Sequence, residues 1–273
     1  MKKRIYSLVS LLLLSMLAVL MVSCKKEETK ESDYNRIKIE TKELKVLISP
    51  ENPPFEYEKE GQIVGADIAL IERIASQIGV EYKLVEKNYA DLMDALIAGE
   101  GDIVVSAYIY NKERDGVDFS NVYLDNSLAL VTLKSDDAIS STDDMAGKII
   151  AVQENSQSDF YVSDFSNLKS IERCSYVSEC MDMLNNGDVD AVICDINTAT
   201  YYLKQDSEKY SMISLRDTLE KYVVAVRKGS DLLSYVNGAV SSYKNDEDIE
   251  KTIVEHTVHV EEAPVDDTGN GEG

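Results

Sequence analysis

The sequence predicts an α/β protein of two similar α/β lobes, joined by a two-segment hinge, with a cleft between the lobes. The first observation is a repeat: Leu-x-x-Gly-x-x-Asp followed by an apolar stretch occurs at 96–105 and again at 184–193. The second is that apolar segments of strand length alternate with amphipathic segments of helix length in both halves, which favours parallel strands joined by helices. The third is a pair of extended segments between the halves.

The first lobe begins with an apolar strand at 44–49. An amphipathic helix follows at 67–78, because its Ile and Ala side chains recur at helical spacing and Gly79 can end it in the left-handed conformation. The elements expected next are a strand at 82–86, a helix at 90–98 that ends in the first copy of the repeated phrase, and a strand at 103–105.

The second lobe repeats this order, so its sheet should be wound in the same way. Its expected elements are a strand at 148–153, a helix from 158, a strand at 170–177, a helix from 179 and a strand at 191–194. The extended segments at 123–133 and 219–227 would connect the lobes as a hinge that permits domain closure. These boundaries assign 44–124 and 222–259 to lobe 1 and 128–217 to lobe 2.

Polar residues accumulate just beyond the third strand of each lobe, at 106–114 and at 195–202. In open α/β sheets, ligands bind outside the carboxyl ends of the strands. If the two lobes face each other, these two segments line one ligand cleft.

The N-terminal segment resembles a bacterial lipoprotein signal. A basic start is followed by an apolar stretch at 8–22, short of the about 20 apolar residues that a membrane span needs, and then by Cys24 and a polar run. The resemblance implies that 1–23 is a signal peptide, that Cys24 carries acyl chains such as palmitate, and that 24–43 is a linker. The alternative is an uncleaved anchor helix. Either way, we expect the protein to work outside the cytoplasm at the cell membrane, and in the first case as a lipid-anchored protein.

The chain is strongly acidic. Removal of 1–23 takes away three basic residues and no acid, which leaves 25 basic against 50 acidic residues, a net charge of −25. Nucleic acid and anionic membrane surfaces are poor partners for such a field, since both attract basic patches. Residues 260–273 are predicted to be an acidic, solvated tail with no binding role.

Cysteines and histidines indicate neither a metal site nor a cofactor. Cys174, Cys180 and Cys194 remain after Cys24; the first two could form a disulfide, but buried thiols are preferred. His256 and His259 lie beside the acidic tail and are interpreted as surface residues. Because no other histidine exists, a Ser-His or Cys-His catalytic pair in the cleft is excluded.

An ordered series of short motifs over 44–245 resembles the extracytoplasmic solute-binding proteins of polar amino-acid ABC importers. Its members are Pro53-Pro54-Phe55, Gly65-Ala66-Asp67, Ala95-Leu96 with Gly99 and Asp102, Glu113-Arg114, Phe119-Ser120, Val152-Gln153, and Asp190-Ala191-Val192 with Asp195. The resemblance implies a type II periplasmic-binding fold, an amino-acid ligand, a permease in the membrane as partner, and a monomer.

The resemblance also assigns two charged contacts. Arg114 corresponds to the residue that holds the ligand's α-carboxylate, and Asp195 to the one that holds its α-ammonium. Asn111 is a natural helix N-cap, so Arg114 should lie in a first helical turn, where the macrodipole disfavours a cation unless an anion is present. The alternatives are an Arg114 that pairs with a surface carboxylate and an Asp195 that caps a helix. Together the two charges complement a zwitterion.

Other positions define the rest of the predicted site. By resemblance, Ser106, the backbone of Ile109 and Ser156 are hydrogen-bonding residues, and Phe55 belongs to the first motif. The chain departs from the usual family pattern at Asn52, Asn111 and Glu154. Tyr89 and Tyr108 would supply aromatic surface beside the ligand, although ordinary packing explains Tyr at such positions equally well.

The function predicted from the sequence is capture of an amino acid between two closing lobes and delivery to a membrane permease, without covalent chemistry. One alternative is a dehydratase-like enzyme on the same scaffold, for which Glu154 is the only unexpected acid near the cleft. A sensory domain that acts through a partner is another. The sequence does not name the amino acid.

Overall fold

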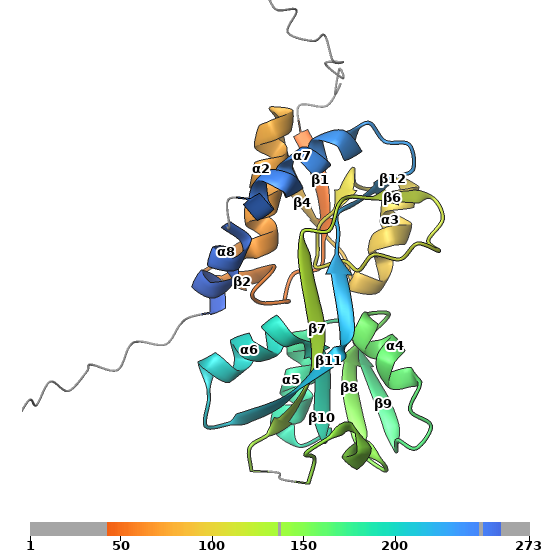
Figure 1. Ribbon diagram of the computed structural model, residues 1–273, viewed down its shortest axis with the longest axis vertical. Helices are drawn as coiled ribbons and strands as arrows, with labels where there is room; N and C mark the ends of the chain where they lie inside the picture. The colour runs from red at the N-terminus through yellow and green to blue at the C-terminus, as the bar shows by residue number, and fades with distance from the viewer. Residues whose placement is uncertain (1–42, 136–137, 246–247, 258–273) are drawn as a thin grey trace, which may run out of the picture. The chain divides into compact units, whose positions relative to one another are not determined.

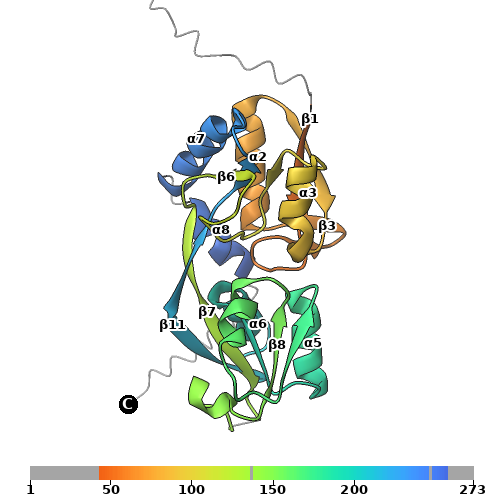
Figure 2. The same ribbon diagram turned by 90° about the vertical axis from the view of Figure 1, so that its right-hand side faces the viewer.

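The computed structural model describes residues 43–135, 138–245 and 248–257 (Figure 1). It contains two five-stranded sheets and a two-stranded hairpin. Helices cover both faces of each large sheet, as Figures 1 and 2 show. Two α/β lobes are therefore present, as predicted.

The sheet of lobe 1 has the order β4-β1-β5-β12-β6. Its strands are β1 (Glu43–Ile48), β4 (Glu81–Glu86), β5 (Ile103–Val104), β12 (Ala225–Arg227) and β6 (Val117–Phe119). The first three pair in parallel, whereas β12 runs antiparallel to both of its neighbours. The remaining elements of this lobe are the hairpin strands β2 (Tyr57–Lys59) and β3 (Gln62–Val64), the 3-10 turn η1 (Tyr89–Asp91), and the helices α2 (Ala66–Ile78), α3 (Leu92–Ala98), α7 (Leu232–Asn245) and α8 (Asp248–Thr257).

The sheet of lobe 2 has the order β11-β7-β10-β8-β9. Its strands are β7 (Leu124–Leu133), β8 (Ile149–Gln153), β9 (Ser170–Cys174), β10 (Ala191–Asp195) and β11 (Tyr210–Tyr222), and its helical elements are η2 (Thr142–Met145), α4 (Gln157–Ser163), α5 (Val177–Asn186) and α6 (Ile196–Gln205). The parallel set β9-β8-β10 has the same order as β4-β1-β5 in lobe 1. The prediction that both sheets are wound alike is confirmed.

The repeated phrase performs the same local task in each lobe. Gly99 and Gly187 end α3 and α5 in the left-handed region, with φ of 81° and 76°. The Asp three residues later then accepts a hydrogen bond from the backbone of the neighbouring strand: Asp102 from the N–H of Lys45 (2.9 Å) and Asp190 from the N–H of Ile149 (2.7 Å). Each phrase therefore closes a helix and ties the next strand to the central strand of the parallel set, β1 in lobe 1 and β8 in lobe 2.

Two long strands, β7 and β11, connect the lobes as an antiparallel ribbon (Figure 2). Their pairing changes register between Leu215 and Glu220. Toward lobe 1, Tyr222 forms an isolated bridge with Ile109. The predicted connecting segments at 123–133 and 219–227 are indeed extended, although β11 begins earlier, at Tyr210.

Apolar side chains fill both faces of each parallel set. In lobe 2, Ala151 and Val192 pack toward α5 and α6, while the alternate residues Val152 and Ile193 pack toward α4. In lobe 1, α2 and α7 cover one face and α3 covers the other. This burial on both sides explains why the inner strands β8 and β10 are nearly continuous apolar runs in the sequence.

One expected helix is absent. The prediction that a helix begins after Asn111 is wrong, because the segment forms turns before β6 begins at Val117. The Asn111 side chain accepts a hydrogen bond from the N–H of Glu113 (2.9 Å), and its carbonyl accepts one from the N–H of Arg114 (3.2 Å). Gly116, at φ 84°, then leads into the strand, so there is no room for a second helical turn.

A second boundary also differs. The strand expected at 170–177 ends at Cys174, and the helix expected from 179 begins at Val177. Glu179 causes this early start, because its carboxylate accepts the N–H groups of Ser175 (2.9 Å) and Tyr176 (3.4 Å) ahead of the helix. Because the N–H groups of Ser175 and Tyr176 bond to Glu179, they are not available to continue the strand.

Within the described part of the chain, no helix is both long and apolar enough to cross a bilayer. The predicted signal peptide, Cys24, the linker up to residue 42, His259 and the tail at 260–273 lie outside the described residues. Cys174, Cys180 and Cys194 are buried thiols, in agreement with the preference stated from the sequence.

Candidate functional site

A small cavity lies between the lobes, beyond the carboxyl ends of the parallel strands. Its volume is about 20 Å³, whereas a cavity needs roughly 10–15 Å³ to hold a single water molecule. Residues of both lobes line it: Asn52, Tyr89, Ala107 and Ile109 from lobe 1, and Gln153, Ser156, Gln157, Ser158, Val177, Cys194 and Asp195 from lobe 2. The lobes must part before a molecule larger than water can enter.

Side chains of the two lobes contact each other around this cavity. The Thr198 hydroxyl donates a buried hydrogen bond to Asn52 Oδ1 (2.9 Å), and the Tyr176 hydroxyl donates to Asn88 Oδ1 (3.3 Å). The Ser178 hydroxyl also donates to the carboxylate of Glu51. The structure is therefore a closed arrangement of the lobes.

Asp195 supplies the charge of the cavity. It is the last residue of β10 and the N-cap of α6, and its half-buried side chain makes no capping hydrogen bond to that helix. It is the one charged side chain among the described residues that line the cavity. The alternative that its carboxylate serves to cap a helix is not what the structure shows.

The loop after β8 forms the opposite wall. Ser156 is the N-cap of α4; its hydroxyl donates to the Gln153 carbonyl (2.8 Å) and accepts the N–H of Asp159 (3.4 Å). Asp159 in turn accepts the N–H of Asn155 (3.0 Å) and pairs with Arg173 (2.9 Å). These bonds hold in place the loop whose residues Ser156 and Ser158 line the cavity.

Lobe 1 contributes an aromatic stack and a strained turn. The rings of Tyr89 and Tyr108 stack with their centroids 5.4 Å apart, and Tyr108 stacks in turn on Phe119. Tyr89 lines the cavity, whereas Tyr108 lies behind it. Ala107 lines the cavity with φ of 44°, a conformation that costs energy for a residue with a side chain.

Arg114 does not line this cavity. Its guanidinium pairs with Asp94 Oδ1 (2.7 Å), and it borders a separate open hollow on lobe 1 beside Lys112 and Lys228. It is close enough to Tyr108 to lower the pKa of that hydroxyl, although burial raises this pKa by more. Arg114 thus pairs with a surface carboxylate. Only the side chain of Tyr108 separates it from Tyr89.

Three buried polar residues, Glu56, Asp67 and Ser106, lie behind the lobe 1 wall of the cavity. The Ser106 hydroxyl donates to Glu56 Oε1 (2.7 Å) and accepts the N–H of Ser49 (3.0 Å), so it is already used within the lobe. Asp67 accepts the N–H of the strained Ala107 (2.6 Å). Ser106 therefore supports the cavity wall and does not line it.

Both buried acids have raised pKa values. Burial, and then the nearby charge of Asp67, raises the pKa of Glu56 well above its ordinary value. Burial raises the pKa of Asp67 to about 6, although the N–H of Ala107 and the hydroxyl of Tyr123 act in the opposite direction. The protonated form of these carboxyl groups is favoured at this place.

Phe55 and Glu154, which were also named from the sequence, do not line the cavity. Phe55 is buried in the core of lobe 1, edge-on to Tyr222 with ring centroids 5.3 Å apart. Glu154 is exposed and is not among the residues that line the cavity.

Sequence reasoning missed several lining residues, among them Gln157, Ser158, Val177 and Cys194. Each lies where a strand of lobe 2 ends or where the following helix begins. The rule that ligands lie beyond the carboxyl ends of strands would have identified them, had it been applied to β8 and β9 as well as to β10.

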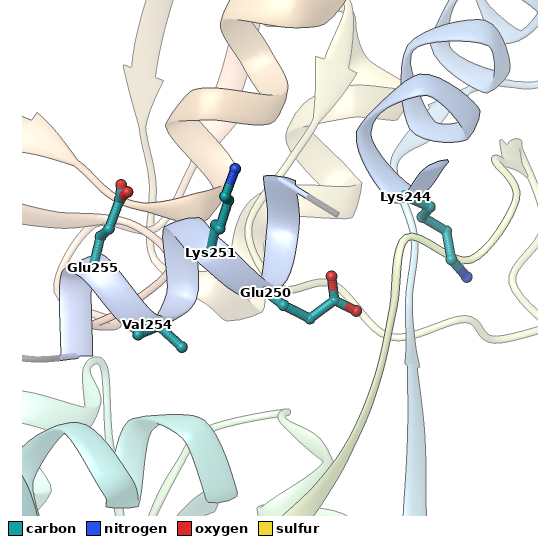
Figure 3. A pocket seen from close by; sticks show the side chains of 5 residues that line it. All are labelled: Lys244, Glu250, Lys251, Val254 and Glu255. Carbon is teal, nitrogen blue, oxygen red and sulfur yellow. The ribbon is translucent and has the colours of Figure 1, made fainter. Parts of the chain in front are cut away.

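A larger hollow, about 580 Å³, lies on the outside of lobe 1 between α7 and α8 (Figure 3). Its lining residues are Lys244, Glu250, Lys251, Val254 and Glu255, and their side chains spread in different directions. None of the predicted site residues lines it. Among the described residues, no three His, Cys, Asp or Glu side chains gather so that they could hold a metal ion.

Comparison with known proteins agrees with the two-lobed fold. Residues 44–257 match the model of the bacterial extracellular solute-binding proteins, family 3. The chain belongs to this family. The match covers both lobes and confirms the family-level prediction made from the motifs.

Relatives of this solute-binding protein carry names of amino-acid-binding proteins. A probable histidine-binding protein of Campylobacter jejuni is 27% identical over 237 residues, which cover 86% of this chain and 92% of the relative. The arginine-binding extracellular protein ArtP of Bacillus subtilis is 28% identical, with coverage of 77% and 84%.

Solved structures extend the comparison to the fold. An ancestral arginine-binding protein bound to glutamine is 31% identical with a TM-score of 0.74, and the match covers 79% of this solute-binding protein and 98% of that chain. The substrate-binding protein AbpA of Streptococcus pneumoniae, bound to L-arginine, is 27% identical with a TM-score of 0.74, and the match covers 79% and 94%. The predicted two-lobed periplasmic-binding fold is confirmed.

Proposed function

We propose that this solute-binding protein captures an amino acid in the cavity between its lobes and delivers it to the permease of an ABC importer, while Cys24 anchors it to the membrane by lipid. The observation that carries the proposal is the cavity itself. It lies beyond the strand ends of both lobes, and one acid, Asp195, stands opposite a wall of hydroxyl and amide groups.

The ligand's ammonium group binds Asp195 in this proposal. A carboxylate that lines a closed cavity is well suited to a charged hydrogen bond, which is stronger than a neutral one. The names of the relatives support an amino-acid ligand, since histidine, arginine and glutamine all carry this ammonium group.

The ligand's carboxylate has two sources of stabilisation. The first is the α4 loop, where Ser156 and Ser158 bring hydroxyl groups to the cavity. The second is Arg114, which exchanges Asp94 for the ligand when the lobes open and close. Its present ion pair is partly exposed, and such pairs are worth about 0–1 kcal/mol, so little is lost when it breaks.

The test is calorimetry on wild type, Arg114→Ala and Asp94→Ala. The ligand is found first by thermal-shift screening of the amino acids, because a ligand that binds only the folded protein stabilises it by mass action. Arg114→Ala should lose about 2–5 kcal/mol of binding, as expected when one partner of a desolvated charge pair is removed. Asp94→Ala, which frees Arg114, should bind at least as tightly as wild type. Unchanged affinity in Arg114→Ala would exclude its role, and no stabilisation by any amino acid would exclude the ligand class.

A further inference from the structure

Two acids, Glu56 and Asp67, lie buried together under the lobe 1 wall of the cavity. Glu56 follows the Pro-Pro-Phe motif and Asp67 lies in the first turn of α2, and both are almost inaccessible to solvent, at 1% and 0%. They are connected to the cavity by a short path, since Asp67 holds the N–H of Ala107, which lines it.

The hydrogen bonds around this pair leave one oxygen unmatched. Glu56 Oε1 accepts the Ser106 hydroxyl, whereas the buried Oε2 has no donor among the described residues. Glu56 and Asp67 are neighbours, because two consecutive residues donate to them: the Ser106 hydroxyl to Glu56 and the Ala107 N–H to Asp67. A hydrogen bond between two carboxyl groups requires a proton on one of them. Two ionised carboxylates offer only acceptors, so the unmatched oxygen marks the place of a proton.

No positive charge compensates the pair. Among the described residues, no ion pair involves Glu56 or Asp67. The titratable groups that face them from neighbouring elements are the Tyr123 hydroxyl, which donates to Asp67 at 2.9 Å, and Asp195, whose charge acts on both acids. Tyr243, beside Tyr123, donates to the carbonyl of Ala66. All of these groups are neutral or negative, and two buried carboxylates at close range cannot both stay ionised at low cost.

We propose that Glu56 and Asp67 share one proton in the ligand-free protein, and that arrival of the ligand's ammonium group at Asp195 expels it. The O–H bond of the pair breaks, both carboxyl groups become anionic, and the proton passes to a water molecule or buffer base. The ammonium group brings a positive charge close to the acid pair. This inference rests on the proposed function only in placing an ammonium group at Asp195.

The consequence is that ligand capture depends on pH. When binding releases a proton, affinity rises with pH, by about tenfold per pH unit for a full proton. The pair thus makes the solute-binding protein hold a cationic group more weakly in acid and more tightly at neutral pH.

The test is isothermal titration calorimetry of L-arginine and of L-glutamine between pH 5.5 and 7.5, in two buffers that differ in ionisation enthalpy. Neither amino acid titrates in this range. Wild type should show a heat of binding that depends on the buffer, which reports a released proton, and an affinity that increases with pH. An identical heat in both buffers and a flat affinity would overturn the proposal.

Two variants locate the proton. In Glu56→Gln, the amide donates to Asp67 permanently and no shared proton is needed, so proton release should fall to near zero. Glu58→Gln removes an exposed acid two residues away and should release as many protons as wild type. Full proton release in Glu56→Gln would overturn the assignment to this pair.

The experiment distinguishes a failure of the proposed function from a failure of the shared proton. If neither amino acid gives heat in any buffer, the proposed ligand class fails, while the shared proton is still tested on the ligand-free protein. Its stability should fall as pH rises through the range in which the pair titrates, and this dependence should be weaker in Glu56→Gln. A stability curve identical in wild type and Glu56→Gln would overturn the shared proton.

Discussion

At the scale of single residues, the site depends on where the charged side chains lie. Arg114 pairs with a carboxylate outside the cavity, whereas Asp195 lines the cavity and does not cap the helix that follows it. The sequence placed both residues near the same cleft, because each follows a strand of its lobe. It did not reveal where each side chain points, since that depends on the turn at Asn111 and on Asp94, which lies 20 residues earlier.

The pKa values of the buried acids predict how stability depends on pH. Because the pKa of Asp67 in the folded protein is raised to about 6 from about 3.8, the folded state binds more protons than the unfolded state between these values. The free energy of unfolding of the ligand-free protein should therefore decrease as pH rises from about 4 to 6, by up to about 3 kcal/mol.

Urea denaturation at several pH values measures this effect. Glu56→Gln should flatten the decrease, because the amide gives Asp67 a permanent hydrogen-bond donor and removes a second ionisable group. Glu58→Gln, at an exposed position of the same hairpin, should follow the wild-type curve. A wild-type stability that increases over this pH range would contradict the raised pKa of Asp67.

At the scale of elements, the repeated phrase shows how far sequence patterns reach. The spacing of Gly99 and Gly187 predicted a helix end and a following strand, and both are present. The pattern did not predict what the following Asp does, because its partner is a backbone N–H on a strand 41 or 57 residues earlier. Contacts of this kind arise only when the sheet has formed.

Asp190→Ala tests the contribution of this bond. The variant leaves the N–H of Ile149 without its carboxylate partner and removes the contact with Lys148, so the protein should lose about 1–3 kcal/mol of stability. The control is Asp188→Ala, an exposed position in the same turn, which should lie within about 0.5 kcal/mol of wild type. Chemical denaturation compares the two; equal stabilities would show that the carboxylate does not support the strand.

Local sequence also explains why some helices and strands were predicted wrongly. Asn111 followed by Glu113 is a good helix start in isolation, but the chain reaches β6 only six residues later. The strand β6 was not anticipated, and β12 was predicted only as part of an extended connection, because each has three residues, too few to show a period. Short elements held by their neighbours in the sheet are the part that sequence patterns predict worst.

At the scale of the whole molecule, ligand access depends on contacts between the lobes. The closed cavity has room for about one water, so every binding or release event includes an opening motion. The hydrogen bond from Thr198 to Asn52 is buried in this interface and opposes opening. The two-lobed arrangement was predictable from the repeat, whereas the closed state and its contacts were not.

Thr198→Val tests this interface with little change of shape. Without the hydroxyl, Asn52 Oδ1 loses its partner in the closed state, so closure should weaken by about 0.5–1.5 kcal/mol and ligand affinity should fall accordingly. Thr200→Val is the matched control, because the Thr200 hydroxyl bonds within its own helix, to the Ile196 carbonyl (2.7 Å). Calorimetry with the identified ligand compares both; equal affinities would mean that this bond does not hold the lobes together.

The position of β12 has a consequence for the order in which the chain folds. This strand lies inside the lobe 1 sheet, between β5 and the edge strand β6, yet it follows the whole of lobe 2 in the sequence. A chain that emerges from its N-terminal end can therefore complete the β8-β9-β10 unit while the lobe 1 sheet still lacks the strand that joins β6 to β5. Lobe 2 is then the first half able to bury its core, and lobe 1, which holds the acid pair, is finished last.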